Sequence, residues 1–174
     1  MNQTAPTKPP EPQTSSLASS IAHIAATLSA DHFPTGDLAT LRRLSPSSPP
    51  SLTFYRFAFK HLPDNWESNR DAWRTLVAGI ALLCPKPHRP DRPVGQALAE
   101  AGYSEKRLER LLAAEGETLH TLLLRAVRFL AAKNEACNWV DFARLLLSVD
   151  SAKQEQARLT IARNFYRYLS DKKD

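Results

Sequence analysis

The amino-acid sequence predicts an all-α protein, a helical bundle of about eight to nine helices in two small lobes. Apolar residues recur three and four positions apart over most of the chain, which is the spacing of a helix face. The thirteen prolines gather in a few segments, and the 81 residues after Pro93 contain none, so helix interiors there are uninterrupted. Only five glycines occur, and repeated Asn-Gly or Asp-Gly hairpin signals are absent, which argues against a sheet.

Residues 1–16 precede the first predicted helix and form a polar, Pro-rich stretch. Such a segment cannot bury enough apolar surface to order itself, so we expect a disordered N-terminal tail. Periodicity and the proline breaks then predict helices, in order, over residues 17–31, 37–44, 51–61, 66–84, 94–102, 104–115, 117–133, 138–149 and 152–169.

Prolines separate the first four of these helices. Pro34, the "PSSPP" loop at 46–50 and Pro63 each lie between two apolar stripes, and a proline ring interrupts a helix because it lacks a backbone N–H. After Pro93 the helices must be separated by capping residues instead. Ser104 is predicted as an N-cap, and Gly116 as the C-cap of the 104–115 helix.

The segment 85–93, "PKPHRPDRP", is the predicted boundary between the two lobes. Its prolines disfavour a helix and its basic side chains favour solvent, so we expect an exposed connection. The predicted organisation is therefore a tail at 1–16, an N-terminal helical lobe at 17–92 and a C-terminal helical lobe at 93–174.

Composition restricts the partner and the compartment. The formal net charge of +5 favours an anionic partner, and 15 of the 23 basic residues are arginines, whose planar guanidinium suits phosphate. The longest apolar run, Leu76–Cys84, is too short to cross a bilayer, which needs about 20 residues. The N-terminus lacks the pattern of a signal peptide, and Cys84 and Cys137 form no C-x-x-C pair. We expect a cytoplasmic protein with reduced thiols and no membrane contact.

The sequence contains no pattern typical of catalysis. It has no H-E-x-x-H, no paired Cys/His spacing, no phosphate-binding P-loop and no G-x-G-x-x-G, so neither a metal nor a cofactor is predicted. The five histidines are scattered, and the acids lack the D-x-D and E-x-x-H patterns of two-metal nucleases. The prediction is that this protein is not an enzyme and has no catalytic residue.

Charged residues fall into paired and unpaired sets. Pairs three positions apart on one predicted helix are Glu67 with Arg70, Asp71 with Arg74, Asp141 with Arg144, and Glu155 with Arg158. Two windows, residues 38–63 and 118–134, contain basic residues and no acid. Their basic residues are Arg42, Arg43, Arg56 and Lys60 in the first window, and Arg125, Arg128 and Lys133 in the second.

Arginines on two of the later helices are predicted to face solvent. Arg125 and Arg128 flank the apolar stripe of the 117–133 helix, and Arg107 and Arg110 share one face of the 104–115 helix, where nearby glutamates partly offset them. Separate arginine groups of this kind suit a protein that follows a phosphate backbone. Aromatic residues at helical spacing usually pack in a core, and this is the interpretation we favour for "FYRFAFKHL". Base stacking is the alternative, and Tyr55 is the residue of this segment best suited to it.

Six segments of the chain carry a family resemblance. They are "GDLATLRRL" at 36–44, "TFYRF" at 53–57, "DAWRTLVAGIALL" at 71–83, "PVGQALAEAGYSEKRLERLLAA" at 93–114, "NWVDFARLLL" at 138–147 and "IARNFYRYL" at 161–169. Together and in this order they resemble the CasB family, the small subunit of the type I-E CRISPR surveillance complex Cascade. The loops at 46–50 and 85–93 and the tail depart from the family pattern.

The resemblance implies an all-α, non-catalytic subunit that acts in antiviral defence. Family members are present as two copies beside the crRNA-bound backbone subunits, where a basic face is thought to hold crRNA paired with target DNA and the displaced strand, stabilising the R-loop. The residues implied to contact nucleic acid are Arg42, Arg43, Arg56, Arg107, Arg110, Arg125 and Arg128.

Two alternatives remain open at this stage. The first is a helical adaptor that binds acidic protein partners without touching nucleic acid. The second is an enzyme whose site is assembled entirely by tertiary structure.

Overall fold

The computed structural model describes residues 16–172. The predicted tail therefore lies, except for Ser16, outside the described residues. The helices of the described part are α1 (Leu17–Ser29), α2 (Thr35–Arg42), α3 (Leu52–His61), α4 (Arg70–Leu83), α5 (Val94–Glu100), α6 (Glu105–Ala113), α7 (Gly116–Ala132), α8 (Trp139–Leu147) and α9 (Ser151–Asp171), with a short 3₁₀-helix, η1 (Trp66–Asn69), before α4. The all-α prediction is confirmed.

Each predicted helix has a counterpart, and two local assignments are wrong. The helix predicted over 66–84 is divided into η1 and α4, because Asn69 leaves the helical conformation with φ −130° and ψ 41°. Gly116 is not the C-cap of α6, which ends at Ala113 with Ala114 as its cap. It instead begins α7 with φ +53°, a left-handed conformation that glycine adopts without steric cost.

Side-chain caps explain where several helices begin. Ser104 caps α6 as predicted, since its hydroxyl accepts a hydrogen bond from Arg107 N. Ser16, Ser51, Asn138 and Asp150 cap α1, α3, α8 and α9 in the same way. Each cap satisfies one of the backbone N–H groups that the first turn leaves without a partner.

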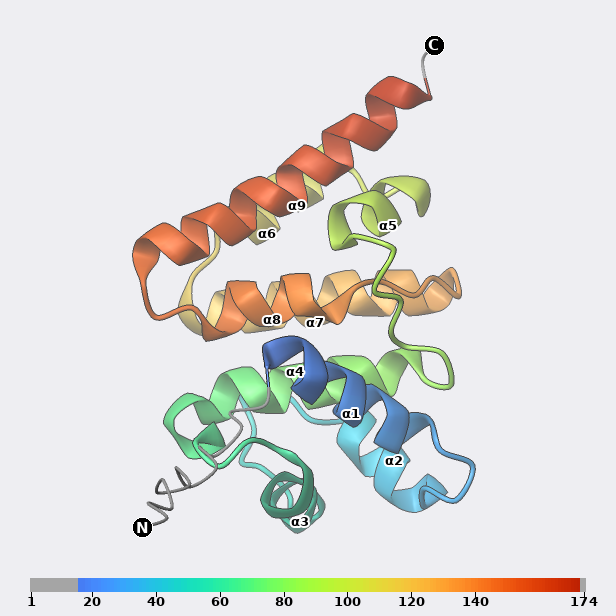
Figure 1. Ribbon diagram of the computed structural model, residues 1–174, viewed down its shortest axis with the longest axis vertical. Coiled ribbons are helices and arrows are strands. Elements are labelled where there is room, and N and C mark those ends of the chain that lie inside the picture. Colours follow the sequence, from blue (N-terminus) through green and yellow to red (C-terminus); the bar gives the residue numbers. More distant parts are fainter. Residues whose placement is uncertain (1–15, 173–174) are drawn as a thin grey trace, which may run out of the picture.

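The helices form layers along the long axis of the molecule (Figure 1), with α1, α2 and α3 at one end, α7 and α8 in the middle, and α5, α6 and α9 at the other end. Helix α4 lies between the first two layers and packs against α1 and α2 as well as α7 and α8. Nearly every residue of α4 from Ala72 onward is buried. One hydrophobic core therefore extends from Ile21 in α1 to Phe165 in α9.

The connection over residues 85–93 is held against the rest of the chain at two points. Pro87 and Arg92 are buried, so the prediction of an exposed connection is wrong for these two residues. The Arg92 guanidinium donates hydrogen bonds to the Glu100 and Glu135 carboxylates and to Ala136 O. Trp139 Nε1 donates to Pro87 O at 2.9 Å, which ties the same segment to α8. The predicted boundary between two lobes stays a prediction, and the core is continuous across it.

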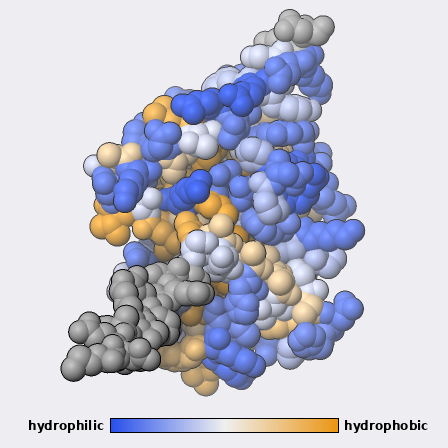
Figure 2. Space-filling view, viewed as in Figure 1, coloured by the Kyte–Doolittle hydropathy of each residue, from blue (hydrophilic) through white to orange (hydrophobic). Residues whose placement is uncertain are grey.

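One face of the molecule is mostly polar. Figure 2 shows one face of the molecule as largely hydrophilic, with hydrophobic residues exposed in small groups. Between Ser16 and Lys172, no helix combines the length and the apolar character needed to span a bilayer.

Candidate nucleic-acid interface

The structure places the seven predicted contact residues in two separate groups. Arg42 is the last residue of α2, Arg43 is its C-cap and Arg56 lies in α3, and the three are called here the α2–α3 arginine group. The other four lie on α6 and α7, away from α2 and α3 in the layered fold. They are called the α6–α7 arginine group: Arg107, Arg110, Arg125 and Arg128. The family resemblance implied one set of seven contact residues, and in the folded chain these residues lie in two groups.

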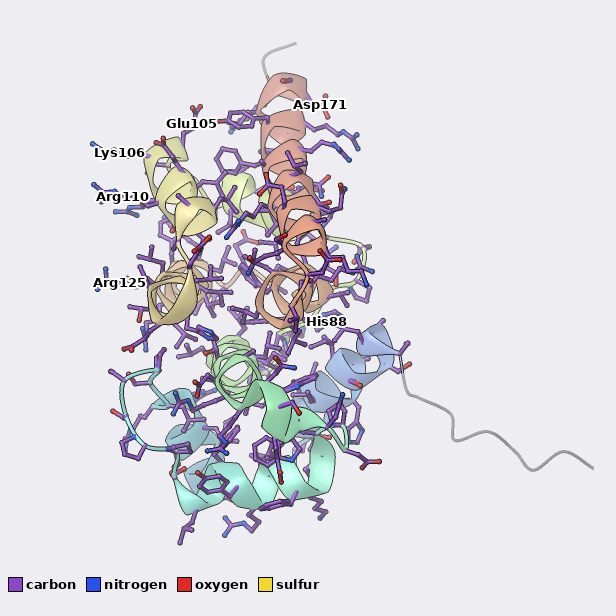
Figure 3. All side chains as sticks on the ribbon, turned by 90° about the vertical axis from the view of Figure 1, so that its left-hand side faces the viewer. His88, Glu105, Lys106, Arg110, Arg125 and Asp171 are labelled. Carbon is purple, nitrogen blue, oxygen red and sulfur yellow. The ribbon has the colours of Figure 1, made fainter. Side chains whose placement is uncertain are left out.

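The α6–α7 arginine group lies on two adjacent helices, since α6 packs against α7. All four side chains are exposed, and none forms an ion pair within residues 16–172. Arg110 and Arg125 project from the same side of the molecule (Figure 3). This side is turned away from the viewer in Figure 1, where α6 and α7 lie behind α9 and α8.

Lys106 is an additional member of this surface that sequence reasoning missed. Its side chain projects on the same side as those of Arg110 and Arg125 (Figure 3). The signal was present in the sequence, because Lys106 precedes Arg110 by four residues, and positions four apart lie on one helix face.

Arg107 has a defined position on this surface. Its guanidinium carbon lies 5.8 Å from the centre of the Phe129 ring, within the range of a cation–π interaction. Phe129 is held in turn by Tyr103, whose ring packs edge-on at 5.2 Å between centroids. Arg107 therefore joins α6 to α7 while its charge stays exposed to solvent.

The two adjacent arginines at the end of α2 have different surroundings. Arg42 Nε donates a hydrogen bond of 2.8 Å to Ala81 O in the last turn of α4, and the side chain is partly buried. Arg43 is exposed and forms no ion pair within the described residues. Arg42 thus has a structural role in addition to its predicted phosphate contact, whereas the Arg43 guanidinium is available for its predicted phosphate contact.

Arg56 is not the unpaired cation that its local sequence suggests. Its Nη2 donates to both carboxylate oxygens of Asp37, each at 3.0 Å. Asp37 is 19 residues away and lies in α2, so the acid-free window around Arg56 gave no sign of it. The Arg56 side chain is still 66% exposed, and an exposed pair of this kind contributes little stability.

The aromatic residue most available for stacking in α3 is Phe59, not Tyr55. Phe59 is 70% exposed and packs edge-on against Trp66. Tyr55 is half-buried beside Phe54. The preference for Tyr55 as the exposed aromatic residue is therefore wrong, because the turn of α3 directs position 59 outward.

Two of the four predicted ion pairs form. Asp71 pairs with Arg74 at 3.2 Å and Glu155 pairs with Arg158 at 3.5 Å. The ion pairs of residues 16–172 include neither Glu67 with Arg70 nor Asp141 with Arg144.

The Asp141 carboxylate has another partner. It accepts a hydrogen bond from Val94 N at the start of α5, and burial raises its pKa. Arg144 is therefore a further exposed cation without an ion pair among the described residues, contrary to the predicted pairing.

His88 and His120 each lie within hydrogen-bonding distance of a group inside the fold. His88 Nδ1 accepts a hydrogen bond from Trp139 N, and His120 Nδ1 lies 2.8 Å from Thr75 Oγ1. Burial lowers the pKa of both imidazoles, so both are neutral near pH 7. Among the described residues, no three His, Cys, Asp or Glu side chains gather closely enough to hold a metal ion.

Comparisons with known proteins point to one family. The family model described as CRISPR-associated protein Cse2 matches residues 37–166. The crystal structure of CasB from Thermus thermophilus has a similar fold, with a TM-score of 0.68 and 24% sequence identity over 87% of this chain and 99% of that chain. A chain in the crystal structure of E. coli Cascade bound to a PAM-containing dsDNA target is similar with a TM-score of 0.63 and 20% identity, over 83% of this chain and 95% of that chain. No curated protein matches.

Proposed function

This chain belongs to the CRISPR-associated protein Cse2 family, and from that membership we propose that it is a non-catalytic, nucleic-acid-binding subunit of a Cascade complex. The family match confirms the resemblance carried by the six sequence segments. The proposed role is to stabilise the pairing of crRNA with target DNA, and the displaced strand, during antiviral defence. The observation that carries this proposal is the α6–α7 arginine group, exposed and without ion pairs in the described part of the chain, with Lys106 beside it.

Phosphate contact is the role that suits these side chains. A guanidinium presents a rigid set of donors that can grip two phosphate oxygens at once. Contacts to phosphate fix the position of a strand without reading its sequence, which is what a subunit that acts on many different targets requires. Arg107, held against Phe129, is the best positioned of the four, because less side-chain freedom is lost when it binds.

A small number of such contacts is enough to shift the equilibrium of R-loop formation. Formation of an R-loop exchanges one duplex for another of similar stability, so modest additional stabilisation shifts the balance. A contribution of about 1 kcal/mol from each of four arginines would change the equilibrium constant by roughly 1,000-fold. No bond need be made or broken for this role.

The partners in this proposal are crRNA, target DNA, other Cascade subunits and a second copy of the chain. The E. coli structure that shares this fold is Cascade bound to a double-stranded DNA target. That structure supports a place for this chain in an assembly that binds double-stranded DNA, and the charge of the α6–α7 arginine group supports contact with a strand.

The proposal is tested by titrating the purified chain into labelled single-stranded DNA, double-stranded DNA and single-stranded RNA over a range of salt concentrations. Removal of each phosphate contact lowers the slope of log K against log salt by about 0.7 for single strands. The variant with Arg107, Arg110, Arg125 and Arg128 changed to alanine should therefore bind more weakly at low salt and lose a slope of about 2 to 3.

A variant that removes three positive charges from another helix controls for most of the loss of net charge. Lys153, Arg163 and Arg167 on α9 are exposed and form no ion pair within the described residues. Changing these three to alanine should leave most of the affinity and slope intact. Equal losses in both variants would show that binding is not located on α6 and α7, and absence of binding by the folded wild type at low salt would favour the protein adaptor.

A further inference from the structure

A groove of about 960 Å³ runs between α6 and α9. Hydrogen bonds tie the two helices together at both ends of it. Tyr166 Oη donates to Glu105 Oε2 at 3.3 Å, and Arg158 Nη2 donates to Ala114 O at 3.4 Å. These two hydrogen bonds span the groove near its ends. We call this space the α6–α9 groove.

Apolar side chains from both helices line the α6–α9 groove. On α9, Leu159, Ala162 and Tyr166 line it at positions three and seven residues apart, which lie on one helix face. Leu159 and Tyr166 are each 49% exposed, and Leu112 and Ala113 of α6 continue the apolar lining. Large apolar side chains left accessible inside a concave surface are typical of a binding site.

The rim of the groove carries negative charge. The charged lining residues are three acids, Glu105, Glu109 and Glu155, and two bases, Lys106 and Arg158, which leaves an excess of one negative charge. Glu105 and Glu109 lie four residues apart on the wall formed by α6, and neither forms an ion pair within residues 16–172. Arg158 on the opposite wall is paired with Glu115 at 3.8 Å and Glu155 at 3.5 Å. These acids disfavour a phosphate backbone and favour a partner with basic side chains.

We propose that the α6–α9 groove binds a basic amphipathic helix of a partner protein, with apolar side chains against Leu159 and Tyr166 and lysines or arginines beside Glu105 and Glu109. The α6 wall extends from Glu105 to Ala113, about 12 Å at 1.5 Å per residue, which matches two to three turns of helix. Both walls are helices whose backbone groups are already bonded, so an extended peptide would find no backbone partners there. A helix satisfies its own backbone and needs only the groove.

This surface adjoins the proposed nucleic-acid interface at Lys106, which lines the groove, but none of the four arginines lines it. Glu105 and Glu109 line the groove, whereas Arg107 is directed toward Phe129 of α7. The glutamates that offset the arginines in the sequence of α6 therefore belong to a different face. One helix can contribute to a protein contact on one side and a nucleic-acid contact on the other.

The experiment uses a fluorescein-labelled peptide of about 14 residues, with leucines at every third and fourth position and lysines elsewhere, which is long enough to span the groove as a helix. Its binding to the whole chain is followed by fluorescence anisotropy. Leu159→Ser should weaken binding about tenfold, because burial of a leucine contributes roughly 1.5 kcal/mol. The double variant E105Q/E109Q should weaken binding several-fold and reduce its dependence on salt.

Two controls locate the effect. Leu52→Ser changes a leucine that is 83% exposed on α3, outside the groove, and should leave binding unchanged. The same peptide with glutamate in place of every lysine should bind at least tenfold more weakly. Equal binding of the two peptides, an equal loss in Leu52→Ser, or no binding to the folded wild type would each overturn the proposal.

Two further measurements distinguish the α6–α9 groove from the arginine surface and from a self-association interface. The quadruple arginine variant should keep peptide binding, and Leu159→Ser should keep DNA binding, so failure of one proposal does not imply failure of the other. Light scattering of the wild type and Leu159→Ser reports self-association. A wild-type dimer that Leu159→Ser dissociates would show that a second copy occupies the groove, and would overturn the proposed partner.

Discussion

At the scale of single residues, the atoms around an arginine decide what its charge can bind. Arg42 and Arg43 are adjacent in the sequence, yet Arg42 donates a hydrogen bond to Ala81 O while Arg43 faces solvent. Arg56 carries the same charge but is held by Asp37. A hydrogen bond inside the fold contributes to stability, whereas a guanidinium without a partner in the fold is available to a ligand.

This difference predicts that two neighbouring substitutions affect different properties, stability in one case and DNA binding in the other. Arg42→Ala should lower the free energy of unfolding by about 1 kcal/mol, because it removes the hydrogen bond to Ala81 O. Arg43→Ala should change stability by less than about 0.5 kcal/mol and should weaken DNA binding instead. Urea denaturation followed by circular dichroism measures the first effect, and the salt titration measures the second. A larger stability loss in Arg43→Ala would contradict the assignment.

At the scale of helices, α5 depends on close contact with α9. A methyl group built on Gly95 would lie 2.1 Å from Ile161 O and 2.7 Å from Phe165 N. Both are backbone atoms of α9, so no side-chain rotation can relieve the overlap. Although α5 has only seven residues, this contact and the hydrogen bond that Val94 N donates to the Asp141 carboxylate hold it in position.

Gly95→Ala should therefore lower the free energy of unfolding by about 2 to 3 kcal/mol, because the two helices must separate. Gly36→Ala is the matched control. Gly36 lies in α2 with no atom within 4 Å of the added methyl group, so the substitution should be neutral or stabilising by up to about 1 kcal/mol. Both are measured by urea denaturation, and similar results for the two variants would show that the α5–α9 contact is less tight than described.

At the scale of the whole molecule, the helices share one core. Residues before and after Pro93 belong to the same cluster of buried side chains, and the 85–93 connection is fastened by Arg92 and Trp139. A protein with such a core is expected to unfold as a single unit.

The corresponding measurement compares unfolding in the two predicted lobes. Trp66 and Trp73 lie before Pro93 and Trp139 lies after it, and all three are buried. Urea unfolding should give the same midpoint by circular dichroism, by the fluorescence of a Trp139→Phe variant, and by the fluorescence of a variant that retains only Trp139, each referred to circular dichroism of the same variant. Two separate transitions would support independently folding lobes.

The local sequence alone was sufficient to predict the helices and the family. Apolar spacing, prolines and capping residues act within a few positions of the chain, so the limits of most helices could be placed without knowing how they pack. The six segments that resemble CasB are also contiguous runs of residues, and the match over 37–166 confirmed them.

Only the tertiary structure decided how charges and surfaces are combined. Arg56 meets Asp37 across 19 residues and Arg92 meets Glu135 across 43, so a search for acids near each arginine in the sequence could not find either pair. Packing also assigned the acids of α6 to the α6–α9 groove and its arginines to another side. The physical reason is that helix formation depends on neighbours along the chain, whereas a binding surface depends on which helix faces the packing brings together.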